Sequence, residues 1–212
     1  MFQFAREGYP FISIFLLITI VTAVFGIAWI SAVAFILTIF MFYFFRDPDR
    51  VTTEDDNAFY APADGKVISI GETQEDEFLK AAALKISIFM SPLDVHINRA
   101  PCAGTVKDVM HKPGKFYNAY TDDAAILNEH ISMLLHSGTH GDIVVKQIAG
   151  AVARRCVCRV NPGTSLAQGE RYGIIKFSSR ADIFLPLDTR VKVKLDDRVT
   201  AGETVIAIKE QS

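Results

Sequence analysis

The feature that most constrains this chain is an apolar run without a single charge, Phe11–Phe45, near the N-terminus. The run has 35 residues, whereas one helix crosses a bilayer with about 20. It is too long for the core of a signal peptide, and no small-residue cleavage site separates it from the rest of the chain. Two short helices around Gly26 would use this length, so we predict a membrane-embedded helical hairpin.

Charges at the two ends of the run predict its orientation. Arg6 precedes it, and Arg46 and Arg50 follow it. Positive charge at both ends favours the cytoplasmic side for both, and therefore for the remainder of the chain at the cell (inner) membrane. The hairpin need not span the bilayer fully. One long tilted span is an alternative, and a buried hairpin of a soluble protein is another, although the following region offers little helix to bury it.

Residues 47–212 have the pattern of a β-rich globular domain. We expect strands at 66–70, 83–90, 104–110, 128–137, 142–148 and 151–160, and on both sides of the Ser-Ser pair within 173–186. Short strands with Gly and Pro turns at this spacing indicate an all-β barrel or sandwich. The segments APADGKVISI, APCAGTVKDVMHKPGKF and DDRVTAGETVIAI resemble half-motifs of biotinyl/lipoyl-type sandwiched barrels. We therefore predict a helical hairpin over 1–46 and a sandwiched-barrel-like domain over 47–212.

Composition excludes several classes of partner and site. The net charge is −2, without the basic excess of a nucleic-acid-binding protein. The three cysteines, Cys102, Cys156 and Cys158, form no C-x-x-C pair, which argues against a disulfide framework and a structural zinc site. We expect no metal and a reducing setting for the globular part.

Three residue types outside the apolar run could carry chemistry. Asp64 lies in a Pro-Ala-Asp-Gly turn, His96 lies between Val95 and Ile97, and Ser178-Ser179 lies between two apolar segments. Taken singly, each is typical of a turn or of a buried structural histidine. Together they are the parts of an activated hydroxyl, with Ser179 as the candidate nucleophile. The remaining histidines have no metal-ligand spacing, and we interpret them as structural or surface residues: His111, His130, His136 and His140.

Seven segments make the pattern more specific. In order between residues 44 and 186, they are FFRDPDR, APADGKV, IFMSPLDVHINRAPCAGTV, KPGKFYNA, NEH, QIAGAVARR and GIIKFSSRADIFLP. With them the chain resembles phosphatidylserine decarboxylases of the short, bacterial and archaeal type. The resemblance implies a proenzyme that cuts itself between Ser178 and Ser179 into chains 1–178 and 179–212, which stay associated.

The resemblance also implies a self-made cofactor. The Ser179 hydroxyl would attack the carbonyl of Ser178, β-elimination would release the upstream chain, and the dehydroalanine left behind would hydrolyse to a pyruvoyl group and ammonia. The pyruvoyl ketone would form a Schiff base with the amine of phosphatidylserine and accept electrons as CO₂ leaves. The product would be phosphatidylethanolamine.

Further roles are implied by the same resemblance. His96 would be the base for the cut, oriented by Asp64, and a proton donor in decarboxylation. Arg99 or Arg180 would bind the phosphate or carboxylate of the substrate, because a planar guanidinium suits both. The chain departs from the family at two positions: Ser178 stands where Gly is usual, and Arg99 where many longer members carry a second histidine. The bilayer is an expected partner, and a homo-oligomer is among the assemblies that the sequence allows.

Three other functions share some of these features. A decarboxylase of a related serine lipid, such as archaetidylserine, would use the same chemistry on different tails. A membrane-anchored biotinyl/lipoyl-like adaptor or carrier would need a modifiable lysine at a hairpin tip between small or Met residues, and no such tip occurs. A membrane serine peptidase using Ser179 would keep its chain intact.

Overall fold

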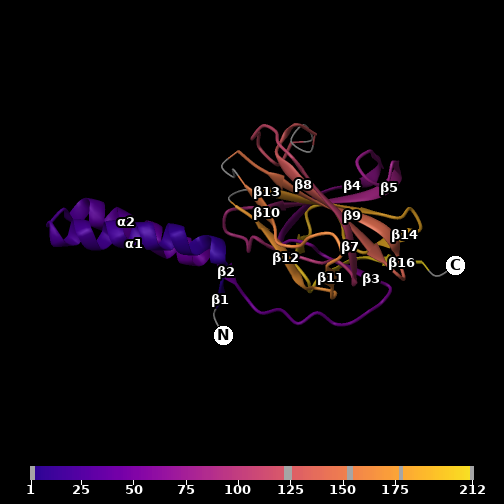
Figure 1. The fold of residues 1–212 in the computed structure, drawn as a ribbon, viewed down its shortest axis with the longest axis horizontal. Coiled ribbons are helices and arrows are strands. Elements are labelled where there is room, and N and C mark those ends of the chain that lie inside the picture. The colour runs from indigo at the N-terminus through magenta and orange to yellow at the C-terminus, as the bar shows by residue number, and fades with distance from the viewer. Residues whose placement is uncertain (1–2, 122–125, 152–154, 177–178, 211–212) are drawn as a thin grey trace. The chain divides into compact units, whose positions relative to one another are not determined.

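The computed structural model describes residues 3–121, 126–151, 155–176 and 179–210 (Figure 1). The chain divides into two compact units, Met1–Asp49 and Arg50–Ser212, and each is described by itself.

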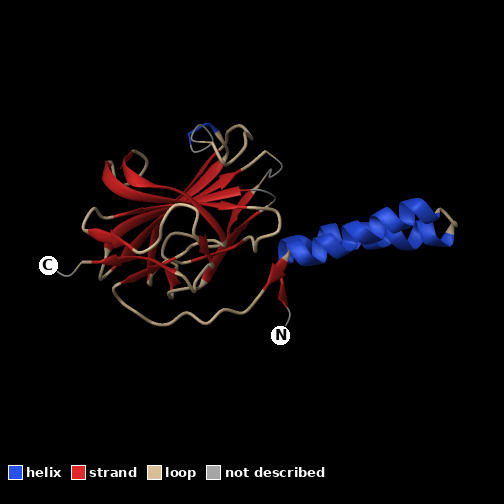
Figure 2. Ribbon diagram, turned by 180° about the vertical axis from the view of Figure 1, so that it is seen from behind, coloured by secondary structure: helices blue, strands red, loops and turns tan. Residues whose placement is uncertain are grey.

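The first unit is a pair of helices. A 3-10 turn, η1 (Arg6–Gly8), leads into α1 (Tyr9–Val24), and α2 (Ala28–Phe44) returns alongside it (Figure 2). The chain reverses at Gly26, whose φ of +72° is readily adopted only by glycine. Strands β1 (Gln3–Phe4) and β2 (Arg46–Asp47) pair at the open end. Two helices are therefore present, as the length of the apolar run predicted, and not one long helix.

The outward side chains of these helices are large and apolar. Leu17, Ile36 and Trp29 are 61%, 64% and 72% exposed. Helices of 16 and 17 residues are about 24–26 Å long at about 1.5 Å per residue, against about 30 Å for the hydrocarbon core of a bilayer. Within the described residues, the segment Arg6–Val24 is long and apolar enough to cross a membrane, and α2 is a shorter apolar helix.

The second unit is built on an eight-stranded antiparallel sheet that curls into a half-barrel (Figure 2). Its strands, in spatial order, are β11 (Ser165–Leu166), β7 (Gly104–Lys112), β8 (His130–Ser137), β9 (Gly141–Ala149), β13 (Ser179–Leu185), β5 (Ala81–Met90), β4 (Gly65–Glu75) and β15 (Arg198–Val199). Two three-stranded sheets complete it: β10 (Cys156–Cys158), β12 (Arg171–Ile175) and β6 (Ile97–Arg99), and β14 (Thr189–Val191), β16 (Val205–Lys209) and β3 (Ala58–Tyr60).

The β-rich prediction is confirmed in its main features. The strands expected at 66–70, 83–90, 104–110 and 142–148 are present, and each is longer than expected. The strand expected at 128–137 begins two residues later, at His130. In the described part of 151–160, only Cys156–Cys158 forms a strand that pairs with a neighbour. The sandwiched-barrel likeness stays a prediction.

Alternation along β13 separates two environments. Ala181, Ile183 and Leu185 belong to the main hydrophobic core, whereas Arg180 and Asp182 form an ion pair on the opposite face. All seven residues of the strand are buried. The sheet is therefore covered on both faces at this strand.

Glu77 fastens the β4–β5 connection to the sheet on this polar face. Its carboxylate accepts hydrogen bonds from His130 Nε2 at 2.8 Å and from the Ser132 hydroxyl, and it pairs with Lys146 Nζ at 3.1 Å. Burial alone would raise the pKa of Glu77, but the bonds from His130 and Ser132 and the charge of Lys146 outweigh it and hold that pKa well below its usual value. His130 is thus a structural residue, as expected from the sequence.

Replacing Glu77 tests this fastening. We expect Glu77→Gln to destabilise the fold by about 2 kcal/mol near pH 7, because it weakens several charge-assisted bonds at once. For a chain of this size, that is roughly a 4–8 °C fall in Tm. A carboxyl whose folded pKa is depressed stabilises above its unfolded pKa of about 4.3 and loses this effect as pH falls. The difference between the two proteins should therefore shrink below about pH 4.

Thermal unfolding of the full chain in detergent across this pH range measures the effect. Glu72→Gln, on the exposed part of β4, is the matched control and should leave Tm unchanged. Equal Tm values for wild type and Glu77→Gln at pH 7 would contradict the assignment.

Candidate active site

Ser179 occupies the first position of the strand with partners on both sides. It lies opposite Met90, the last residue of β5, and opposite Ala149, the last residue of β9. The side chain is fully buried, and its hydroxyl donates to Met90 Sδ at 3.4 Å. Ser178, the other half of the predicted cleavage site, lies outside the described residues. The candidate nucleophile is therefore at the end of a central, well-paired strand. We call the border of the sheet formed by these strand ends its edge.

Asp64 lies at the same edge. It directly precedes β4, and Lys66 of β4 and Arg180 of β13 both face Phe89 of the intervening strand β5. Neighbouring strands are about 4.8 Å apart, so two strand spacings place the Asp64 backbone about 10 Å from the start of β13.

His96 is brought to this edge by a short connection. Residues 91–96 run from Met90, which faces Ser179, to His96, whose carbonyl accepts a hydrogen bond from Ile175 N at 3.2 Å. Ile175 is the last residue of β12. Both ends of the 91–96 connection are thus tied to the two ends of the connection 176–178, which contains the predicted cut. His96 is therefore bonded to Ile175, at one end of the connection that contains the predicted cut.

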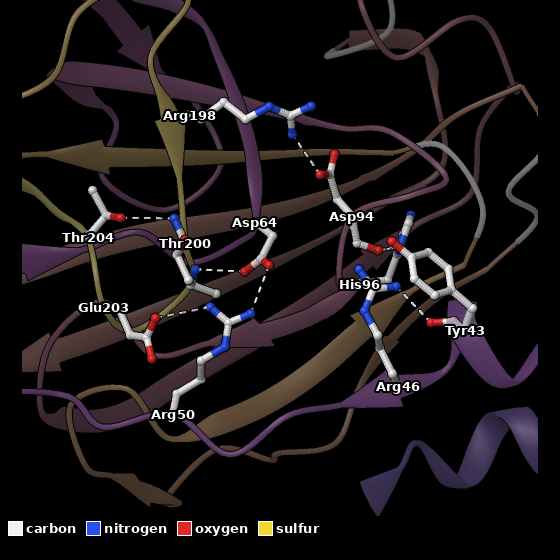
Figure 3. A network of polar contacts seen from close by, with 11 residues as sticks. Tyr43, Arg46, Arg50, Asp64, Asp94, His96, Arg198, Thr200, Glu203 and Thr204 are labelled. Carbon is white, nitrogen blue, oxygen red and sulfur yellow. Dashed lines mark hydrogen bonds and ion pairs between the residues drawn. The ribbon is translucent and has the colours of Figure 1, made fainter. Parts of the chain in front are cut away.

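The tautomer of His96 is set by a backbone carbonyl. The imidazole is fully buried, and its Nδ1 lies 2.9 Å from the carbonyl oxygen of Asp94. A carbonyl can only accept, so Nδ1 carries the proton and Nε2 carries the lone pair of the neutral ring. The Asp94 carboxylate accepts hydrogen bonds in turn from Ser91 N at 2.8 Å and from Arg198 Nη1 at 2.8 Å (Figure 3). Asp94 was missed in the sequence, although its position two residues before the histidine was a usable signal.

Asp64 has different partners from those that the sequence suggested. Its carboxylate accepts from Arg50 Nη2 and from Ala201 N, both at 2.8 Å, and Arg50 also reaches Glu203 at 3.5 Å (Figure 3). Neither the Asp64 carboxylate nor the Ser179 hydroxyl hydrogen-bonds to His96 within the part of the chain that the structure describes. The three residues share one edge of the sheet without forming a hydrogen-bonded triad in this arrangement.

The two candidate anion ligands are engaged by protein groups. Arg99 is nearly buried and donates to the Gly169 carbonyl at 2.9 Å. Arg180 is fully buried and binds both carboxylate oxygens of Asp182, at 2.6 and 3.0 Å, and the Ser87 hydroxyl at 2.9 Å. Sequence reasoning missed Asp182, although residues two apart share a face of a strand.

No cluster of three or more His, Cys, Asp or Glu side chains suited to a metal ion occurs among the described residues. The thiols of Cys102 and Cys156 are buried, and burial raises the pKa of Cys102 to about 12. These thiols are therefore protonated at neutral pH and inert as nucleophiles.

Comparison with known proteins is consistent over nearly the whole chain. A family model described as phosphatidylserine decarboxylase matches residues 37–207. A relative from Syntrophotalea carbinolica, named phosphatidylserine decarboxylase proenzyme, is 46% identical over 202 residues, which cover 95% of this chain and 94% of the relative. A relative of the same name from Desulfotalea psychrophila is 43% identical, over 95% of this chain and 94% of the relative. Another, from Geobacter sulfurreducens, is 45% identical, over 96% of this chain and 95% of the relative.

Gly65 offers a test of how the edge is built. Its φ is +152°, and a Cβ here would lie 2.1 Å from the Phe89 carbonyl oxygen. We expect Gly65→Ala to push β4 away from β5, to displace Asp64 and to lower stability by about 3 kcal/mol. Gly71→Ala is the control on the same strand, because no atom lies within 4 Å of its added Cβ. Thermal unfolding compares the two, and equal shifts would show that close packing at Gly65 is unimportant.

Proposed function

The chain belongs to the phosphatidylserine decarboxylase family, and on this basis we propose that it cuts itself between Ser178 and Ser179 and then converts phosphatidylserine to phosphatidylethanolamine and CO₂. The observation that carries the proposal is the position of Ser179, which begins a strand paired on both sides and lies at the edge that also holds Asp64 and His96. A cut before this residue leaves the whole of β13 in place.

The cut needs a base and a hydroxyl. His96 Nε2 accepts the Ser179 hydroxyl proton as Oγ attacks the Ser178 carbonyl, which exchanges the amide bond for an ester. Loss of the Ser179 α-proton then breaks the Cβ–O bond and releases residues 1–178 as a carboxylate. Hydrolysis of the remaining dehydroalanine gives ammonia and the pyruvoyl group. The Ser179 hydroxyl first rotates away from Met90, a change of one side-chain torsion.

The two products stay together because strands of the short chain lie in the interior of two sheets. The short chain supplies β13, which lies between β5 and β9, and β16, which lies between β3 and β14. The first of these pairings runs over seven residue pairs with β5 and six with β9. We therefore propose an enzyme of two associated chains, 1–178 and 179–212.

The surroundings of residue 179 suit a pyruvoyl group. The residue is fully buried next to Met90, and His96 is bonded to Ile175, the last residue of the preceding strand β12. When present, the group supplies an electron sink for the decarboxylation. His96 would hold or deliver the proton that replaces CO₂. The orienting role of Asp64 and the anion-binding roles of Arg99 and Arg180 remain predictions.

We also propose that the first unit inserts into the cell membrane with both ends on the cytoplasmic side. A helix that is apolar all round is suited to lipid or to a protein core, and most large side chains of α1 and α2 face outward. This anchor would keep the enzyme at the bilayer that contains its lipid substrate.

Replacing the nucleophile tests the proposal directly. We expect Ser179→Ala to remain a single chain and to lose decarboxylation at least ~1,000-fold, because it lacks both the attacking oxygen and the cofactor precursor. Intact-protein mass spectrometry should find wild type as two fragments meeting at Ser178/Ser179, the short one without a free amine. Ser165→Ala, at an exposed strand position, is the control. Release of CO₂ from phosphatidylserine by Ser179→Ala would show that the pyruvoyl assignment is wrong.

A second variant tests the base. We expect His96→Gln to slow the cut about 100-fold or more, because Nε2 no longer offers a basic lone pair. The time course of fragment appearance after synthesis measures this. His136→Gln, at an exposed histidine paired with Asp142, should cut at the wild-type rate. A wild-type rate in His96→Gln would assign the base to another residue.

A further inference from the structure

Exposed large apolar side chains of the second unit gather at one place. Among the described residues of this unit there are nine, and six of them lie in two connections at the edge where β13 begins. Leu93 belongs to the 91–96 connection. The other five belong to the connection 113–129 between β7 and β8: Phe116 (38% exposed), Tyr117 (44%), Tyr120 (53%), Ile126 (73%) and Leu127 (43%). We name these six residues the edge patch.

The register places the edge patch beside Ser179. Residue pairs at this end of the sheet lead from β7 to β13. Lys112 at the end of β7 faces His130 at the start of β8, and His130 faces Ile148 near the end of β9. The next residue of β9, Ala149, faces Ser179 at the start of β13. The connection 113–129 therefore emerges from the same edge as the predicted cut. By contrast, Leu187 follows the other end of β13, about 20 Å away along a strand of seven residues.

The described parts of the connection 113–129 are bonded to residues next to the candidate nucleophile. The Asn128 side chain is buried, exchanges two hydrogen bonds of 2.8 Å with the Tyr117 backbone, and donates to the Ala149 carbonyl at 2.7 Å. Arg180 Nη1 donates to the Thr121 carbonyl at 3.3 Å. The Tyr120 ring packs edge-on against Phe89 with centroids 5.4 Å apart. Hydrogen bonds thus hold the described backbone that carries these exposed apolar side chains.

The chemistry of the edge patch fits the surface of a bilayer. Two tyrosines and a phenylalanine stand among aliphatic residues, and amphipathic aromatic rings favour the membrane–water interface. Two lysines of this region are also solvent-exposed: Lys112, whose Nζ lies 4.0 Å from Glu77, and Lys115, whose Nζ lies 3.3 Å from the Tyr117 hydroxyl. Exposed lysines at such a surface attract anionic lipids.

We propose that the edge patch docks the catalytic edge onto an anionic lipid bilayer, as a second membrane contact separate from the helical hairpin. The inference rests on the proposed function, because a substrate held in a bilayer must reach residue 179. The patch shortens the path by which the headgroup, still attached to its membrane-held tails, enters the site.

Fluorescence of the full chain in vesicles tests the contact. Trp29 is the single tryptophan, so Trp29→Phe gives a silent background. Each test tryptophan is placed in this Trp29→Phe background, with vesicles of phosphatidylcholine and phosphatidylglycerol whose tails are brominated. The tryptophan fluorescence of Ile126→Trp should be quenched at least about twofold more than that of Leu187→Trp. Phosphatidylglycerol keeps the bilayer anionic without being consumed. Equal quenching at the two positions would overturn the proposal, as would burial of Ile126→Trp by a second copy of the chain in detergent without lipid.

Activity provides a second readout, which separates this inference from the proposed function. In the double variant Ile126→Ser and Leu127→Ser, KM for phosphatidylserine in vesicles should rise about tenfold, because two apolar side chains no longer enter the interface. Turnover of a short-chain phosphatidylserine dissolved below its micelle concentration should not change. Leu187→Ser is the control for both substrates. Equal losses on the two substrates in the double variant would show a structural role instead, whereas a wild-type chain inactive on both would refute the proposed function itself.

Discussion

The pairing of β13 with β5 and β9 is the constraint on which the rest of this structure depends. Antiparallel ladders on both sides fix the strand from Ser179 onward, and every one of its residues is buried. Because β13 lies between two partner strands, it cannot dissociate from the sheet without breaking the hydrogen bonds in the middle of the sheet. A precursor that is to be cut before this strand therefore needs no covalent link to hold its two parts together.

The buried ion pair of Arg180 and Asp182 explains how the register of that strand is kept. A slip by one residue would exchange the faces of every side chain of β13, placing Arg180 and Asp182 among Ile86, Ile88 and Val145 of the core. Burying these charges among apolar groups would be very unfavourable. The pair thus ties Ser179 to its position opposite Met90. This gives Arg180 a structural reason to be a fixed cation, whatever else it binds.

Local patterns of the sequence predicted the elements, and long-range pairing decided the contacts. The apolar run with its central Gly26 indicated two helices, and strand alternation indicated most of the sheet. The partners of Asp64 could not be predicted in the same way, because Arg50 and Ala201 meet it through the path of a loop and a turn distant in sequence. Glu77 is a similar case, since nothing local links it to His130, 53 residues later. Side-chain pairing across strands depends on register, which a single sequence specifies only weakly.

The state of the Ser179 hydroxyl is compatible with the proposed self-cleavage. Nearby polar groups have strong partners: Arg180 binds a carboxylate at 2.6 Å, and the Asn128 amide bonds three backbone groups. The Ser179 hydroxyl instead donates to a thioether, which is a weak acceptor. Exchanging this contact for the imidazole of a nearby base costs little, whereas breaking a charge-assisted bond would add about 1.5–3 kcal/mol to the barrier. A well-paired strand thus carries one weakly bonded hydroxyl at its first residue, where the proposed cut requires freedom of a single torsion.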